Sequence, residues 1–237
     1  MAIKEKKFEY VDSEQVYVNK GYVIRFTHIP TNKEVWFKGL ITDYRDQFSS
    51  NWNEQEVYGR QDPIVTFQGT KRNINFSWDV VASSFVEAQL NMEKISLLIS
   101  MLYPVYSGDN ASSITTAPLF KVGFANLIHN VNEGVGSGLV AKIDGFNFEP
   151  VLEEQFFDVF HNYLYPKSLK VSCNMTILHT HPLGWRADNK EARTKKFPYS
   201  EEYTPDPENI KTTEGVSADG TLEQQSAKQN LVLGVKK

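Results

Sequence analysis

The hydrophobic and polar positions along the chain follow the two-residue period of a β-strand most strictly between residues 73 and 80. The apolar positions of this segment are Ile74, Phe76, Trp78 and Val80, and the polar positions between them are Asn73, Asn75, Ser77 and Asp79. Because successive side chains of a strand point to opposite faces, we expect the first set to pack in a core. The second set would then face water or another subunit.

Three other segments have strand patterns. Residues 21–41 contain the apolar stretches GYVIRFTHI and EVWFKGLI with PTNK between them, which predicts a β-hairpin. Residues 139–148 alternate but change phase at Gly145, which indicates a β-bulge. A further long strand is predicted by the alternation of Leu169, Val171, Cys173, Met175 and Ile177.

Residues 84–102 have instead the three- and four-residue spacing of an amphipathic helix. Ser84 and Glu87 have the spacing of a capping box, in which each side chain satisfies an exposed backbone N–H. Pro104 would end the helix because it lacks a backbone N–H. The apolar stripe consists of Phe85, Ala88, Met92, Ile95, Ile99 and Leu102.

The segments between these elements have weaker patterns. We predict a connector over residues 42–58, a short strand at 64–67 and a reversal of the chain at 68–71. Beyond the helix we predict a polar loop over 105–117, a strand over 118–128, a flexible hairpin loop over 130–138, and a short helix or irregular aromatic segment over 153–165.

These elements predict a mainly β (α+β) domain over residues 21–185, an antiparallel sandwich or barrel with one packed helix at about 84–102. Residues 1–20 are expected to form a loosely held N-terminal arm. Residues 186–237 contain no Trp or Cys and have no clear period, so they would bury too little apolar surface to offset their ordering entropy. This polar C-terminal extension is expected to be disordered or to order on a neighbour.

Composition and charge narrow the class of protein. Apolar residues make up 41% of the 237 residues, charged residues 23%, and the net charge is −4. An acidic balance argues against a protein held to nucleic acid by phosphate contacts. The single cysteine cannot form an internal disulfide, the N-terminus lacks an apolar leader, and no run has the ~18 apolar residues of a membrane span. We therefore expect a soluble protein made in a reducing compartment.

No residue pattern forms a complete catalytic or metal-binding signature. His179 and His181 would share one face of a strand and suit zinc, but they also extend a core-facing row, which is the interpretation we favour. Glu153, Glu154 and Asp158 could serve a hydrolase as acid and base, or simply cover a solvated helix face.

Two further segments carry chemistry-bearing residue types. Cys173 lies in a strand pattern, where a thiol is usually a small buried apolar group. The sequence GVGSG at 134–138 precedes a strand, whereas a phosphate-binding loop needs a following helix. Neither segment indicates a catalytic or cofactor site.

Arginine and aromatic residues near the strand at 73–80 suit a subunit interface. Arg60 and Arg72 flank predicted turns, and Asp62 follows Arg60 closely. Each arginine could form an exposed ion pair worth at most ~1 kcal/mol, or pair its planar fork with a carboxylate on a neighbouring subunit. Trp52 and Tyr58 lie at loop edges, where aromatic residues serve an interface as well as a core.

The order of these blocks resembles that of a known family. The blocks are VWFKGLITDYRDQFSSNW, then YGRQDPIVTFQGTKRNINFSWDVVASSFVEAQLNMEKISLLISMLYPVY, APLFKVGFANLI, GLVAKIDGFNFEP and YPKSLKVSCNMTILHTHPLGW. Over residues 35–185 they resemble the central hub and tube-initiator proteins of contractile-tailed bacteriophage baseplates, which share the tail-tube fold. The long segment after Trp185 favours a hub or initiator over the repeated tube protein.

The resemblance implies a structural virion protein that forms a six-fold ring, starts or continues the tail tube, and lines the channel for DNA ejection. Its expected partners are further copies of itself, the tail tube protein, other hub or wedge proteins and the tape-measure protein, with DNA only in transit and no membrane. It would be assembled in the host cytoplasm and need no catalytic residue, metal or cofactor. The alternatives are a cell-wall glycan hydrolase of the tail and another tube or terminator ring component.

The residues predicted to lie at the subunit interface or channel wall follow from both lines of argument. They are Trp52, Tyr58, Arg60, Asp62, Arg72, Asn73, Asn75 and Asp79. A mildly acidic chain suits a channel that must release DNA, because cations on the wall would hold phosphates.

Overall fold

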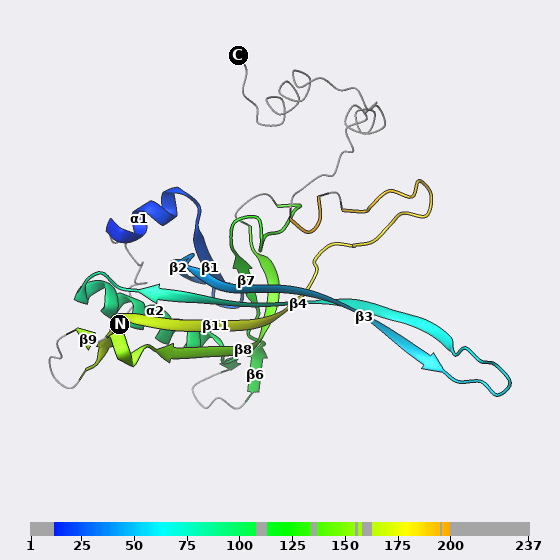
Figure 1. Ribbon diagram of the computed structural model, residues 1–237, viewed down its shortest axis with the longest axis horizontal. Helices are drawn as coiled ribbons and strands as arrows, with labels where there is room; N and C mark the ends of the chain where they lie inside the picture. Colours follow the sequence, from blue (N-terminus) through cyan, green and yellow to red (C-terminus); the bar gives the residue numbers. More distant parts are fainter. Residues whose placement is uncertain are drawn as a thin grey trace, which may run out of the picture. The chain divides into compact units, whose positions relative to one another are not determined.

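The computed structural model describes residues 12–107, 113–133, 137–154, 156–157, 163–194 and 196–199, with the backbone alone for 12–15 and 154 (Figure 1). The chain has a unit boundary after residue 200. All described residues belong to the first unit. It is mainly β with antiparallel pairing throughout, which confirms the predicted fold class.

Seven strands form the main sheet, in the order β2-β1-β7-β8-β11-β4-β3. Their bounds are Val23–His28 (β1), Lys33–Lys38 (β2), Ile41–Gln55 (β3), Ile64–Val81 (β4), Phe120–Gly123 (β7), Leu139–Pro150 (β8) and Ser168–Ile177 (β11). Two small ribbons pair β5 (Val105–Ser107) with β6 (Ser113–Thr116), and β9 (Phe156–Phe157) with β10 (Tyr165–Pro166).

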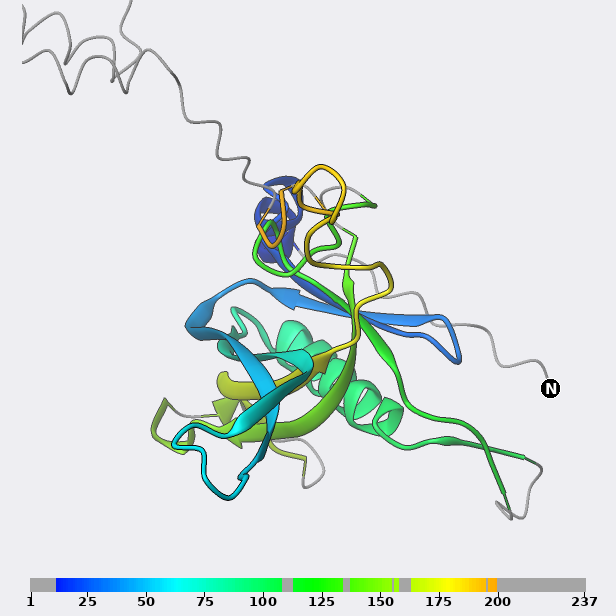
Figure 2. The ribbon, with the colours of Figure 1, turned by 90° about the vertical axis from the view of Figure 1, so that its right-hand side faces the viewer.

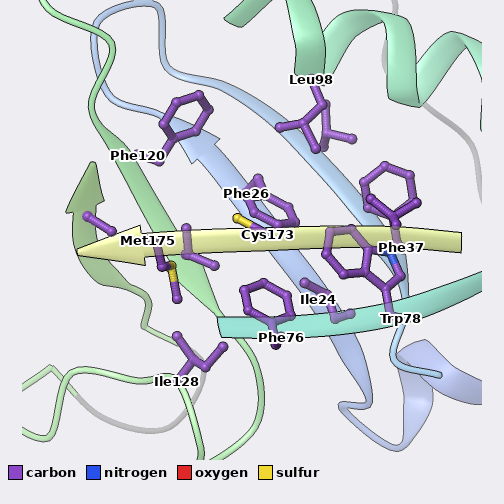
Figure 3. Close-up of a cluster of buried hydrophobic side chains, with 14 of the residues drawn as sticks. Ile24, Phe26, Phe37, Phe76, Trp78, Leu98, Phe120, Ile128, Cys173 and Met175 are labelled. Carbon is purple, nitrogen blue, oxygen red and sulfur yellow. The ribbon is translucent and has the colours of Figure 1, made fainter. Parts of the chain in front are cut away.

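The sheet curves around a single aromatic core (Figure 3). Phe26 on β1 packs against Phe76 and Trp78 on β4, with ring centroids 6.2 and 5.7 Å apart. Three strands lie between β1 and β4 in the sheet order, so these contacts require the sheet to bend back on itself. Figure 2 shows α2 (Phe85–Met101) lying in the hollow of this curved sheet, where its buried Ile95 and Leu98 join the core.

The strands at the two edges of the sheet, β2 and β3, follow one another in the chain. Gly39 and Leu40 join them, and the Leu40 carbonyl accepts a hydrogen bond from the Asp79 N–H at 2.9 Å. A Cβ on Gly39 would lie 2.5 Å from the Phe124 ring and 2.7 Å from the Tyr22 carbonyl oxygen. Only glycine fits this close corner.

Helix α2 begins as the sequence predicts and is fixed by a buried ion pair. Ser84 is the N-cap and accepts from the Glu87 N–H at 3.2 Å. The buried Glu87 carboxylate accepts from Lys38 Nζ on β2 at 2.5 Å, and also from the N–H and hydroxyl of Ser83. The reciprocal capping bond thus reaches Ser83, one residue before the expected donor. The predicted helix is confirmed.

Four other predictions are also confirmed. The hairpin at 21–41 is β1 and β2, the strand at 73–80 is part of β4, and the strand at 169–177 is β11. The register of β8 against β11 shifts between Asn174 and Met175. Asp144 is the extra residue, next to Gly145, as the change of phase predicted.

Two predictions for residues 42–71 are wrong, whereas the short strand predicted at 64–67 is part of β4. The expected connector at 42–58 contains most of the 15-residue strand β3. The expected reversal at 68–71 lies inside the 18-residue strand β4, which continues through Gly69. Gly69 sits at a register shift opposite Asn51 and Trp52, so this glycine marks a bulge rather than a turn.

Several loop predictions need smaller corrections. The predicted polar loop at 105–117 contains the β5–β6 ribbon, and only Phe120–Gly123 of the expected strand at 118–128 is β7. Of the segment at 153–165, the structure shows a 3-10 helix, Leu152–Glu154, and the β9–β10 pair. Residues 134–136 of the predicted hairpin loop lie outside the described residues. The helix α1 (Asp12–Asn19) was not predicted.

The contribution of the aromatic core to stability can be tested by substituting Trp78. It is fully buried against Phe26, Phe37, Phe76 and Phe146, so Trp78→Ala should lower the free energy of unfolding by about 3–5 kcal/mol. Urea unfolding of the two proteins measures the difference. The control is Trp185→Ala, because Trp185 is 74% exposed and its removal should change the free energy by less than about 1 kcal/mol. Equal losses from both substitutions would contradict this account of the core.

Candidate assembly interface

Strands β3 and β4 extend beyond the rest of the sheet as a two-stranded ribbon (Figure 1). β11 pairs with β4 only over residues 73–81, and β4 residues 64–72 pair only with β3. We call residues 48–72 the ribbon. Among the described strands none pairs with the outer edge of β3, so the ribbon presents unpaired backbone groups along that edge.

One face of the ribbon is apolar and continues the core face of the sheet. Phe48 lies opposite Arg72 in the register, four residues before Trp52, so both aromatic side chains lie on the same face of β3. Trp52 pairs with Phe67 across the strands, with ring centroids 5.1 Å apart, and these side chains remain 54% and 52% exposed. Other exposed apolar side chains near the end of the ribbon are Val57, Tyr58, Ile64 and Val65.

The opposite face of the sheet is polar across β4, β11 and β8. In the pairing register Ser77 lies beside Ser172, which lies beside Asn147, and the neighbouring row is Asn75, Asn174 and Gly145. Two adjoining hollows of about 350 and 460 Å³ mark this face, and both are lined by Ser77, Asn147 and Ser172. We call it the polar face.

Charges on the polar face are balanced by their neighbours. Lys170 on β11 lies between Asp79 on β4 and Glu149 on β8 in the pairing register. Lys142 pairs with Asp144 on β8, and the Thr176 hydroxyl donates to both Asn73 and Asp144. The Lys142 ammonium and the Thr176 hydroxyl lower the pKa of the Asp144 carboxyl against the opposing effect of its burial, so this carboxylate stays charged at neutral pH.

The eight residues predicted for the interface fall in three places. Four are exposed on the ribbon. Trp52 lies on its apolar face, and the connection between β3 and β4 contains Tyr58, Arg60 and Asp62. Asn73, Asn75 and Asp79 are half-buried on the polar face. Arg72 is 1% exposed and lies at the base of the ribbon, between these two groups.

Arg72 forms a buried ion pair within its own chain. Its Nε donates to both carboxylate oxygens of Asp46 at 3.0 and 3.1 Å, and its Nη2 donates to Oδ2 at 2.6 Å. The Asp46 side chain is 3% exposed. The sequence left open an exposed pair or an intersubunit pair, and the structure shows a buried intrachain pair on β3 and β4 instead.

The chain returns to this ion pair at residues 196–199, which we call the strap. The Tyr199 hydroxyl donates to Asp46 Oδ2 at 2.9 Å. Phe197 lies 6.2 Å from the Phe48 ring and 5.6 Å from the Arg72 guanidinium carbon. Burial and the bond to Asp46 raise the pKa of the Tyr199 hydroxyl. Part of the segment predicted as an extension thus packs on the β domain.

The candidate chemical residues do not converge. The rings of His179 and His181 lie 6.2 Å apart, and the described residues contain no group of three His, Cys, Asp or Glu side chains placed to hold a metal. Burial raises the pKa of the Cys173 thiol to about 12, so the thiolate needed of a nucleophile does not form at neutral pH. Asp158, the Glu154 side chain and most of GVGSG lie outside the described residues.

Sequence reasoning missed the residues that build the base of the ribbon. Asp46, Phe48 and Phe67 were placed in a connector or a short strand, and the strap residues Phe197 and Tyr199 in a polar extension. A regular alternation of Tyr44, Asp46 and Phe48 was present in the sequence, but its polar members hid it. Among the described residues, no helix has the length and apolar character needed to cross a membrane.

Comparison with known proteins gives distant structural similarity alone. No family model matches this chain, and no curated protein matches it. Among solved structures, the chain is similar to one from the anti-feeding prophage (AFP) baseplate, determined by cryo-EM with 6-fold symmetry. The identity is 8%, the TM-score is 0.25, and the match covers 66% of this chain and 88% of that one. At this TM-score the similarity carries no argument, so any function must be argued from the contacts described above.

The buried pair at the base of the ribbon is tested by Asp46→Ala. The substitution would leave the Arg72 guanidinium buried without its carboxylate, which should lower the free energy of unfolding by about 3–5 kcal/mol. The control is Asp43→Ala on the same strand, whose exposed carboxylate lies 3.7 Å from Arg45 and should contribute less than about 1 kcal/mol. Thermal or urea unfolding measures both. A loss for Asp46→Ala no larger than for Asp43→Ala would contradict the assigned role.

Proposed function

We propose that this chain is a structural subunit of a ring in the baseplate hub of a contractile tail. The ring begins or continues the tail tube and lines the channel through which DNA leaves. The observation that carries the proposal is the ribbon, because its apolar face and its strand edge are both left unfinished by the chain's own described residues.

The apolar face of the ribbon supports assembly through this element. Trp52 and Phe67 are each about half exposed although they contact one another. Covering such side chains contributes roughly 25 cal/mol for each Å² of apolar area removed from water. Contiguous exposed apolar surface of this kind is typical of a site where another protein binds.

The free edge of β3 supports the same conclusion. An unpaired strand edge invites pairing with another chain, and closed rings remove such edges. Identical subunits joined head to tail close into a ring when the rotation between them permits it. The proposed ring is a homohexamer, as the sequence resemblance implies.

The polar face supports the role of channel wall. Its central rows consist of small neutral side chains, and its Lys170 lies between two carboxylates in the register. DNA binds proteins chiefly through cations that contact phosphates, so a wall with balanced charge would let it pass. Asn73, Asn75 and Asp79 would then line the channel, whereas Trp52, Tyr58, Arg60 and Asp62 would contact neighbouring subunits.

The partners of such a ring are the tail tube protein, other hub or wedge proteins and the tape-measure protein. The protein would belong to the virion tail after assembly in the host cytoplasm. The proposed role needs no catalysis, metal or cofactor.

Loss of assembly should follow from changing the apolar face of the ribbon. Trp52→Ser combined with Phe67→Ser removes most of that face while leaving the core unchanged, so the variant should fold but form rings at least about tenfold less readily, since 1.4 kcal/mol corresponds to a factor of ten. Mass measurement and negative-stain imaging, with tube and baseplate components present, provide the readout.

The matched control for this experiment is Tyr103→Ser, which removes another exposed aromatic side chain, 66% exposed and outside the ribbon. Wild-type protein that stays monomeric and binds no tube or baseplate component would count against the proposed function. Normal rings from the double variant would show that the ribbon is not the contact.

The channel wall is tested by adding cations to the polar face. Ser77→Lys combined with Ser172→Lys should leave rings intact but make them retain DNA in a gel-shift assay at low salt, because each added lysine can contact a phosphate. Retention should fall steeply as salt is raised. The control replaces the same two serines by glutamine. If the lysine variant fails to form rings, the polar face lies between subunits instead.

A further inference from the structure

The strap covers a cluster of cationic and aromatic groups at the base of the ribbon. The Phe197 ring packs edge-on against His179, with centroids 5.7 Å apart, and also lies over Arg72. The charged or titratable groups that face His179 are Arg72 on β4, Asp46 on β3, and His181 on its own segment. Asp46 is the carboxylate among these groups, and it already pairs with the Arg72 guanidinium.

Several nitrogens of this cluster lack a hydrogen-bond partner among the described protein atoms. His179 Nδ1, Arg72 Nη1 and both ring nitrogens of His181 are buried without a hydrogen-bond partner among the described protein atoms. An imidazolium donates through both nitrogens, so protonation of His179 in the latched arrangement would add a second cation beside Arg72 and leave the buried Nδ1 without a hydrogen-bond partner among the described protein atoms. Burying such a group is unfavourable unless water reaches it.

We propose that the strap is a pH-sensitive latch, in which protonation of His179 lifts Phe197 and Tyr199 from the base of the ribbon. Lifting the strap lets water reach both imidazole nitrogens and separates Phe197 from Arg72. It also uncovers Phe48, the first residue of the ribbon's apolar face. The latch is a property of this chain alone and does not depend on the proposed ring.

The direction of the pH dependence follows from the state of His179 in the latched structure. Burial, Arg72 and His181 lower its pKa below the ordinary value of 6.5, whereas Asp46 raises it less. The open state, with an ordinary pKa, therefore binds more protons than the latched state once the pH falls below about 6.5. The latch is closed at neutral pH, its stability decreases as the pH falls below about 6.5, and the decrease levels off once the pH is below the lowered pKa of latched His179.

Fluorine NMR of the full chain labelled with 4-fluorophenylalanine tests the latch. The Phe197 signal, assigned with Phe197→Leu, should divide between a latched and an open environment. The ratio of open to latched molecules should rise about three- to tenfold between pH 7.5 and pH 5.5, since a group with an ordinary pKa of about 6.5 contributes at most a factor of ten at pH 5.5. No change over this range would overturn the proposal.

Two variants separate His179 from other titrating groups. His179→Phe keeps a ring against Phe197 but cannot take up a proton, so the ratio should become independent of pH. His28→Gln changes another buried histidine whose pKa is lowered, and it should leave the pH dependence unchanged. An equal rise in wild type and His179→Phe would contradict the latch. If His179→Phe does not fold, the wild-type titration of the His179 ring decides the question, because its midpoint must coincide with that of strap opening.

Discussion

The two-residue period of one long strand links the core of this protein to its exposed ribbon. β4 runs for 18 residues, and its inner half places Ile74, Phe76 and Trp78 in the core. Because the period cannot change without a bulge, the core fixes which face of the outer half is apolar. The bulge at Gly69 then shifts the alternation of β4 by one residue, so that Phe67 rather than Gln68 lies on the same face as Trp52. The ribbon's asymmetry is therefore a consequence of how the core packs.

The transition from core to ribbon falls on a charged residue. Arg72 is buried at a core-facing position of β4, next in the alternation to the core residue Ile74. Asp46 pairs with the Nε and Nη2 groups of the buried guanidinium, while Phe48 and Phe197 cover its face. A buried pair of this kind contributes little net stability but is costly to break, so it fixes the relation of β3 to β4 where the sheet narrows to two strands.

Elements that carry their own pattern could be predicted from the sequence, and those completed by distant residues could not. The alternation at 73–80 and 169–177 and the capped helix at 84–102 are local signals, and all three are present in the structure. β3 was missed because one of its faces is polar throughout and Asp46 interrupts the other. The strap at 196–199 was missed because its contacts are far away in the sequence. They include Asp46, Phe48, Arg72 and His179. At the candidate site, the exposed Trp52 was predicted and the burial of Arg72 was not.

The two edges of the sheet differ in a way that bears on how copies could associate. The six-residue β2 lies against α2, where Lys38 binds Glu87 and the Lys94 ammonium lies 3.5 Å from the Trp36 ring centroid. The 15-residue β3 has no partner strand on its outer edge among the described residues. A two-fold dimer joins the same surface on both subunits, whereas a ring joins two different surfaces. Pairing β3 with β3 would use the same edge on both subunits, and it would end assembly at two. The two edge strands therefore differ in length and in surroundings, and in the proposed ring the open edge of β3 would lie on a different surface of the next subunit.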